Sequence, residues 1–191
     1  MKNILEIYCD GSCWNKPGEP MGLGIAYFLN GKSLEEYNKA IKITYEQAGG
    51  HTTSVMAELS AIEYGIDYLS QIKEEYDTII IYSDNEFSIK VIQGRTHTSL
   101  EHLVPIINKI KENTTKNMSF KWVPRKDNSH ANSLSREALD KDLLSGDKDP
   151  WKDSSLSSPK ISYKQFRMNL AEAYEKEGKL DKAKEVRDSL S

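Results

Sequence analysis

The sequence predicts an α/β fold built on a β-sheet of mixed strand direction. Short runs rich in β-forming residues come first, and segments with helical periodicity follow them. The run TIIIYSD (78–84) is continuously apolar, which is typical of a central strand covered on both faces. The resulting order, β-β-β-α-β-α-α-β-α, corresponds to an antiparallel hairpin unit that leads into a β-α-β crossover.

Three strands are expected in the first part of the chain. Residues 4–10 (ILEIYCD) alternate in polarity and predict a strand that ends at Asp10. Residues 11–22 are rich in Gly and Pro and predict a loop. A second strand over 23–30 and a turn at 31–32 lead to a third strand over much of 33–45, although this last stretch also has a helical interpretation.

Helical periodicity is strongest over residues 52–72, where apolar residues recur at helical spacing. A helix over 99–113 is also predicted, with Pro105 in its interior. The remaining predicted elements are a short helix ending in Gly94, a strand at 118–124 and an amphipathic helix at 125–139.

The chain divides by composition into three parts. Residues 1–144 are expected to form the α/β domain, and residues 145–160, rich in Ser, Asp and Pro, a linker. Residues 161–191 predict a helical hairpin extension that resembles half of a tetratricopeptide repeat. Because a single unit of this kind cannot bury its own apolar face, we expect it to bind a protein partner or to self-associate.

Composition limits the class of protein. The net charge of −3 and the pI near 5.9 argue against a strongly basic nucleic-acid binder, but they permit a local basic strip. No run is long enough to cross a membrane, and the first residues become polar too soon for a signal peptide. Cys9 and Cys13 are the only cysteines, too few for a structural zinc site. We therefore expect a cytoplasmic protein with free thiols.

Three acidic residues lie beside predicted core. Asp10 and Asp84 each end a strand, and Glu58 lies on or next to the buried stripe of the helix between them. Taken singly, Asp84 could cap the helix that follows it, and Asp10 could make a turn with the next loop. Taken together, the three carboxylates are expected to converge at one edge of the sheet, where hard oxygen ligands favour Mg²⁺ or Mn²⁺. Two such ions can clamp the attacking and leaving oxygens of a phosphoryl displacement.

Four stretches resemble, in order, the signature segments of type 1 ribonuclease H. They are YCDGSCWNKPGEPMGLGIAYF, TTSVMAELSAIEYGI, IIIYSDNEFSIKVIQG and KWVPRKDNSHANSLSREAL. The resemblance covers residues 4–140 and implies a five-stranded mixed sheet, with three antiparallel strands followed by parallel ones, flanked by helices. It also implies cleavage of the RNA strand of RNA–DNA hybrids to give a 5′-phosphate, with two Mg²⁺ ions, or Mn²⁺ as a substitute. Asp10, Glu58 and Asp84 are implied as its catalytic metal ligands.

Asn132 stands where the family pattern N-x-x-A-D-x-L-A has its fourth acidic ligand, and Ser135 also departs from that pattern. An amide oxygen can still bind Mg²⁺, but without the negative charge the site it shares with Asp10 is expected to be weaker. We expect reduced or abolished activity. A non-catalytic module that binds RNA–DNA hybrids or double-stranded RNA is therefore the second hypothesis, and an interaction protein with a recruiting helical tail is the third. Natural divergence and a deliberate near-isosteric exchange both explain the asparagine.

The resemblance also implies substrate contacts. Backbone amides of Gly11 and Ser12, with Asn15 or Lys16, would approach the RNA strand, and Thr53 would bind a phosphate of the DNA strand. A simple turn at residues 11–12 and a helix N-cap at residue 53 are the structural alternatives. Trp122 stands where many members have a mobile His, and the basic protrusion of many members is not expected. Binding is therefore expected to be weak and salt-sensitive.

Overall fold

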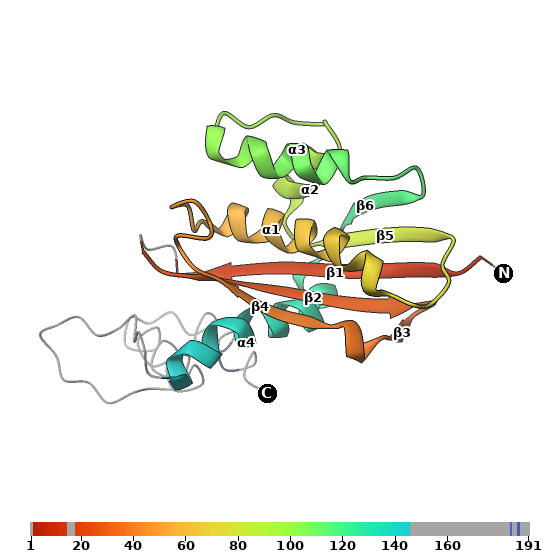
Figure 1. Cartoon of the computed structure of the whole chain (residues 1–191), viewed down its shortest axis with the longest axis horizontal. Coiled ribbons are helices and arrows are strands. Elements are labelled where there is room, and N and C mark those ends of the chain that lie inside the picture. Colours follow the sequence, from red (N-terminus) through yellow and green to blue (C-terminus); the bar gives the residue numbers. More distant parts are fainter. Residues whose placement is uncertain (1, 15–17, 146–183, 185–186, 188–191) are drawn as a thin grey trace, which may run out of the picture. The chain divides into compact units, whose positions relative to one another are not determined.

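The computed structural model describes residues 2–14 and 18–145, together with residues 184 and 187. It forms a mixed β-sheet with helices packed on both faces (Figure 1). Asn15, Lys16, residues 146–160 of the predicted linker and all of the predicted extension except Lys184 and Arg187 lie outside the described residues.

The sheet has the mixed direction that the sequence predicts. Its order is β3-β2-β1-β5-β6, with β4 also paired to β2; β1 and β2 are antiparallel, and β5 is parallel to both β1 and β6. The strands are β1 (Ile4–Cys13), β2 (Met21–Leu29), β3 (Lys32–Ser33), β4 (Lys39–Ile43), β5 (Thr78–Ser83) and β6 (Met118–Trp122). Together β3 and β4 take the place of the predicted third strand, so the helical interpretation holds only for a 3₁₀ turn at Glu35–Tyr37.

The prediction that the first strand ends at Asp10 is wrong, because β1 continues to Cys13. Its antiparallel pairing with β2 continues through Asp10↔Gly24 to Cys13↔Met21, because β2 also begins earlier than expected. Pairing with β5 stops at Cys9↔Ser83. Asp10 is therefore held by a neighbouring strand on one side only, and its other side is open toward the residue that follows β5.

The helices follow the predicted order. They are α1 (Ser54–Asp67), α2 (Glu86–Ile92), α3 (Val104–Glu112) and α4 (Ser129–Ser145). A 3₁₀ turn at Glu101–Leu103 precedes α3, so Pro105 falls in the first turn of that helix and not in its interior. Proline is tolerated there because its missing N–H has no helical partner to lose. In the described part of the chain, none of the helices combines the length and apolar content that crossing a bilayer requires.

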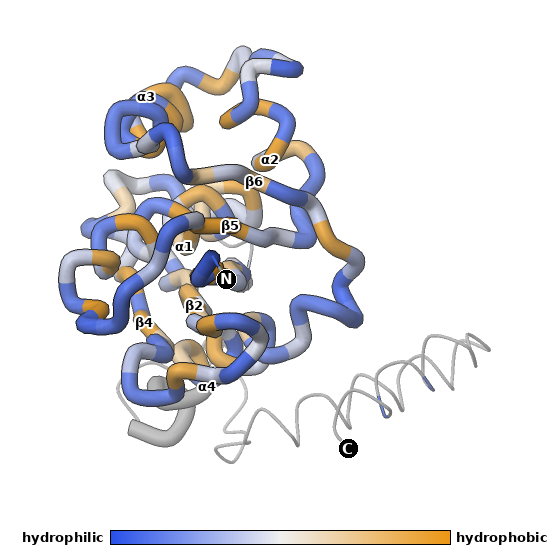
Figure 2. Tube along the Cα trace, turned by 90° about the vertical axis from the view of Figure 1, so that its right-hand side faces the viewer, coloured by the Kyte–Doolittle hydropathy of each residue, from blue (hydrophilic) through white to orange (hydrophobic). Residues whose placement is uncertain are grey.

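The core lies between the sheet and α1, with α2 and α3 on the same side (Figure 1). Hydrophobic segments of β2, β5 and α1 lie inside the domain, and most connecting loops are hydrophilic (Figure 2). Alternate residues of β1 and β2 point to opposite faces, as strand geometry requires. Fully buried members of the core include Leu5, Ile7, Leu23, Ile25, Leu59, Ile62 and Ile81.

Glycines let two helices approach the sheet to backbone contact near Asp10. A Cβ at Gly11 would lie 2.3 Å from the backbone N of Glu58 on α1. On the opposite face, a Cβ at Gly24 would lie 1.9 Å from the carbonyl oxygen of Ala131 on α4. No side chain fits in either place, so α1 and α4 are held in register with the end of β1 that carries Asp10.

Candidate metal centre

The structure brings together Asp10, Glu58 and Asp84, which lie far apart in the sequence. Each contributes one carboxylate oxygen to a group in which all three atoms lie within 4.8 Å of one another. Asp10 and Glu58 are buried, with 3% and 7% of their surface exposed, and Asp84 is half-buried. One edge of the cluster is therefore open to solvent.

Strand topology explains why these side chains meet. Asp84 directly follows Ser83, where β5 ends beside β1, and Asp10 lies one residue beyond the last pair of these two strands. The contact between Gly11 and α1 brings Glu58 to the same point. The capping interpretation of Asp84 is wrong, because the Oδ1 of Asn85 accepts the N-terminal N–H of α2, from Ser88, at 2.9 Å. The turn interpretation of Asp10 is also wrong, because this residue lies within β1.

Glu58 is oriented by neutral hydrogen-bond donors. The hydroxyl of Ser83 donates to its Oε2 at 3.1 Å, and the backbone N–H of Gly11 also bonds to the carboxylate. Burial is the main cause that raises the pKa of Glu58 well above its ordinary value, and the negative charges of Asp10 and Asp84 raise it further. The two hydrogen bonds lower this pKa and offset only part of the rise. The Gly11 amide is therefore bonded within the protein, and the prediction of a simple turn at residues 11–12 is wrong.

Asp10 has a hydroxyl partner on α4. Ser135 is fully buried, and its Oγ donates to Oδ2 of Asp10 at 2.5 Å. Burial raises the pKa of Asp10 to about 6, and the charge of Asp84 adds to the rise. The Ser135 hydrogen bond and the positive charges of Arg125 and Arg136 act in the opposite direction.

Asn132 lies on the first turn of α4 and is half-buried. Its side-chain oxygen accepts a hydrogen bond from Nη2 of Arg125 at 3.2 Å. Its backbone carbonyl lies 3.0 Å from the hydroxyl of Ser135, one helical turn further on. The group of α4 that contacts Asp10 is therefore the hydroxyl of Ser135, and the amide of Asn132 is paired with the guanidinium of Arg125.

Sequence reasoning missed the roles of Ser83 and Ser135. A usable signal existed for each of them. Ser135 is three residues after Asn132 and so lies on the same face of α4. Ser83 directly precedes Asp84 and is fully buried at the end of a strand.

Thr53, Ser12 and Trp122, which the resemblance places near the substrate, each make a hydrogen bond within the protein. Thr53 is the N-cap of α1, with its Oγ1 accepting from the N–H of Met56 at 3.2 Å. The hydroxyl of Ser12 donates to the carbonyl of Ser135 at 2.9 Å, which ties β1 to α4. Trp122 is 49% exposed, and its indole N–H donates to the carbonyl of Asp84 at 3.0 Å. An exposed aromatic ring is thus attached to the rim of the centre.

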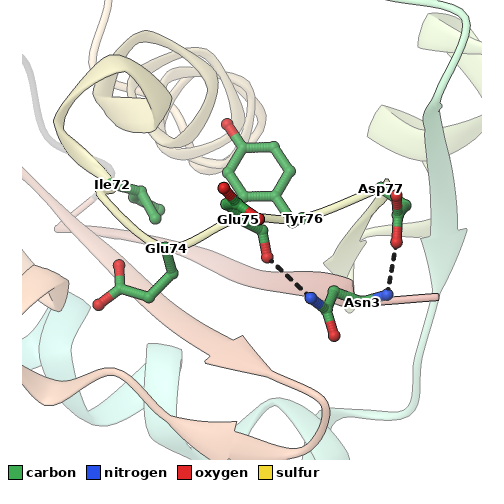
Figure 3. Close-up of a pocket in the computed structure, with 6 residues that line it drawn as sticks. All are labelled: Asn3, Ile72, Glu74, Glu75, Tyr76 and Asp77. Carbon is green, nitrogen blue, oxygen red and sulfur yellow. Dashed lines mark hydrogen bonds between the residues drawn. The ribbon is translucent and has the colours of Figure 1, made fainter. Parts of the chain in front are cut away.

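A separate surface pocket of about 620 Å³ lies at the other end of the strands (Figure 3). Asn3 precedes β1 and Asp77 precedes β5, and the backbone N–H of Asn3 donates to Oδ2 of Asp77 at 2.7 Å. Glu74 and Glu75 add further negative charge to its lining. The negative charge of this lining disfavours phosphate groups.

The fold and the carboxylate cluster define a ribonuclease H-like domain, and comparison with known proteins agrees. The family model described as reverse transcriptase-like matches residues 36–138, and the chain belongs to that family. Ribonuclease H1 of the halophilic archaeon Halobacterium salinarum NRC-1 superposes with a TM-score of 0.63 at 23% identity, covering 72% of this chain and 98% of that one.

A second similar structure is LC11-RNase H1, isolated from compost by a metagenomic approach. It superposes with a TM-score of 0.62 at 26% identity, covering 74% of this chain and 98% of that chain. The same enzyme in complex with an RNA/DNA hybrid has a TM-score of 0.60 at 26% identity and covers 74% and 99% of the two chains. The predicted fold class and the resemblance to type 1 ribonuclease H are confirmed.

Proposed function

We propose that this protein is a divalent-metal-dependent ribonuclease that hydrolyses the RNA strand of RNA–DNA hybrids. The observation that carries the proposal is the convergence of Asp10, Glu58 and Asp84 within 4.8 Å at a partly open edge. The substrate class is supported by the similar LC11 enzyme, whose structure contains an RNA/DNA hybrid.

The donor set fits a hard divalent cation. Three carboxylate oxygens gather at one point, and burial, together with repulsion from neighbouring carboxylates, raises the pKa of both Asp10 and Glu58. A divalent ion relieves that repulsion, and hard oxygen ligands select Mg²⁺ or Mn²⁺. When bound, such an ion lowers the pKa of water and stabilises charge on a phosphoryl group.

The protein's own groups would orient this chemistry. Ser83 and Gly11 hold the Glu58 carboxylate, which we propose also meets the 2′-hydroxyl that distinguishes RNA from DNA. The half-buried Asp84 marks the side from which a phosphate reaches the centre. Hydrolysis adds water to the phosphorus and breaks its bond to the 3′-oxygen, so one product ends in a 5′-phosphate and the other in a 3′-hydroxyl.

The asparagine at position 132 supports reduced activity, and it also supports a second possible function, binding of nucleic acid without cleavage. Because residue 132 is a neutral amide, this point of α4 offers no anionic ligand, and the amide oxygen already accepts a hydrogen bond from Arg125. If the remaining carboxylates do not support turnover, the domain is a module that binds RNA–DNA hybrids or double-stranded RNA. For the same reason, replacing Asn132 by Asp should raise the rate of cleavage.

The test is cleavage of a hybrid with end-labelled RNA, in Mg²⁺ and in Mn²⁺, by this protein and by Asn132→Asp. We expect slow cleavage that chelation of the metal abolishes, and faster cleavage by the variant. Ser133→Asp is the matched control, because it adds the same charge at an exposed neighbouring position of α4. Hybrid binding without cleavage by either protein would establish the binding module, and equal, fast cleavage by both would show that the fourth charge is unimportant.

Two further proposals concern the cellular location of the protein and the role of its C-terminal residues. We propose a cytoplasmic location, consistent with Cys9 and Cys13 forming no disulfide with each other. We also propose that residues 161–191 bind a protein partner or self-associate. Removing the predicted linker and extension tests this, and an unchanged oligomeric state together with unchanged hybrid binding would contradict it.

A further inference from the structure

We propose that the centre holds one divalent ion, and that hydrogen-bond donors from Arg125 and Ser135 take the place that a second ion would occupy. The inference rests on the proposed function for the identity of the site. The number of ions, however, is measured without any cleavage. The resemblance to type 1 ribonuclease H implies that a second ion would be shared by Asp10 and residue 132. Oxygens on both of these residues already accept hydrogen bonds from the protein.

On the Asp10 side, the donor is the hydroxyl of Ser135, 2.5 Å from Oδ2. This hydroxyl has a single proton, and the carbonyl of Asn132, at 3.0 Å, is its more distant acceptor. The backbone of Ser135 lies close to the sheet, since its N is 2.4 Å from the place that a Cβ at Gly24 would fill. Ser12 also binds its carbonyl at 2.9 Å. The packing of α4 on β2 therefore holds the Ser135 hydroxyl in place beside Asp10.

On the Asn132 side, the only side-chain oxygen accepts from Arg125 at 3.2 Å. A guanidinium stays charged at every pH that a folded protein experiences, so an ion bound to the same oxygen would lie beside a permanent positive charge. An aspartate at this position could offset that repulsion with its own charge. An asparagine cannot, so the site between Asp10 and Asn132 disfavours a cation.

The side of the centre formed by Asp10, Glu58 and Asp84 differs, because the donors that orient Glu58 carry no positive charge. The hydrogen bonds that orient Glu58 come from the hydroxyl of Ser83 and the amide of Gly11, which are both neutral. One divalent ion leaves the three carboxylates with one negative charge, which the nearby guanidinium groups of Arg125 and Arg136 offset, whereas two divalent ions would add to an excess of positive charge. Arg125 also keeps further N–H donors that can reach a phosphate oxygen, the stabilising task that a second ion performs in two-ion sites.

The experiment counts Mn²⁺ ions bound to the full chain by calorimetry and by electron paramagnetic resonance, without nucleic acid. We expect one ion per chain, with the spectrum of an isolated Mn²⁺. The same titration is repeated with an RNA–DNA hybrid that carries 2′-fluoro groups in place of the 2′-hydroxyls, after subtraction of the ions that the hybrid binds alone. One protein-bound ion is expected there too.

The decisive variant combines Asn132→Asp, Ser135→Ala and Arg125→Ala. It should bind a second ion, with an exchange-coupled spectrum that shows two neighbouring Mn²⁺. The matched control combines Ser133→Asp with Lys126→Ala, which changes the net charge equally at exposed positions and should still bind one ion. Circular dichroism verifies that each variant is folded.

Two ions of comparable affinity in the unaltered protein would overturn the inference, as would a single ion in a folded triple variant. If the unaltered protein binds no ion, both the inference and the proposed function fail. If it binds one ion and cleaves nothing, the proposed ribonuclease activity fails and the ion count stands.

Discussion

The two sides of the candidate metal centre share one packing device and differ in chemistry. Gly11 lets α1 approach β1, and Gly24 lets α4 approach β2, each to backbone contact. The α1 side places the carboxylate of Glu58 beside Asp10 and Asp84, whereas the α4 side presents an amide and a hydroxyl. The scaffold can therefore hold either kind of group, because close backbone contacts at Gly11 and Gly24 position both helices whichever side chains face the centre.

The two sides also act in opposite directions on Asp10. Desolvation and the charge of Asp84 raise its pKa, whereas the Ser135 hydrogen bond and the charge of Arg125 lower it. The α4 side therefore stabilises the ionised form of Asp10 even without a metal. Substitutions at the centre and changes of pH should separate these opposing effects on Asp10.

Asp10→Asn should have the largest effect, in opposite directions on binding and on stability. Divalent-metal affinity should fall by more than about 100-fold, since even residues that only orient a ligand contribute about 10–100-fold. The metal-free protein should become more stable by roughly 1–3 kcal/mol above neutral pH, because a buried charge is removed. Calorimetric titration and thermal unfolding without metal measure the two quantities. A loss of both metal affinity and stability would contradict the inference that the buried charge of Asp10 destabilises the metal-free protein.

The pH dependence should distinguish metal-free from metal-bound protein. Asp10 and Glu58 have folded-state pKa values above their ordinary ones, so the folded state binds more protons than the unfolded chain. Their contribution to stability is therefore greatest in acid and declines as pH rises through about 6. Metal binding displaces these protons, so the increase in Tm caused by Mn²⁺ should grow from about pH 5 to about pH 8. An increase that is equal at both pH values would show that these carboxylates do not bind the ion.

A pair of buried serines offers the smallest and most specific test. Ser83 donates to Glu58, whereas Ser88 is equally buried but its Oγ has no hydrogen-bond partner among the described residues. Ser83→Ala should weaken metal affinity by about 10-fold, because Glu58 loses a group that orients it. Ser88→Ala should leave affinity unchanged and should be neutral or stabilising. Equal effects on metal affinity would mean that the Ser83 hydrogen bond does not orient Glu58.

Much of the fold could be predicted because its signals are local. Helical periodicity marked the helix that became α1, and the continuous apolar run marked the strand that became β5. The boundaries were harder to predict. The extension of β1 to Cys13 depends on pairing with β2, and the cap of α2 at Asn85, in place of the neighbouring Asp84, depends on where that helix begins. Such contacts involve choices between neighbouring residues that local propensity does not resolve.

The α/β class and the three acidic residues of the centre could be predicted from the chain alone, because periodicity and the placement of acids beside apolar runs are local features. The groups that surround those acids could not be predicted in this way, because they come from distant parts of the chain. The hydrogen bonds from Ser135 to Asp10 and from Ser83 to Glu58 join residues that are 125 and 25 positions apart. Their effects depend on burial and on hydrogen-bonding distance, which arise only once β1, α1, β5 and α4 have packed together.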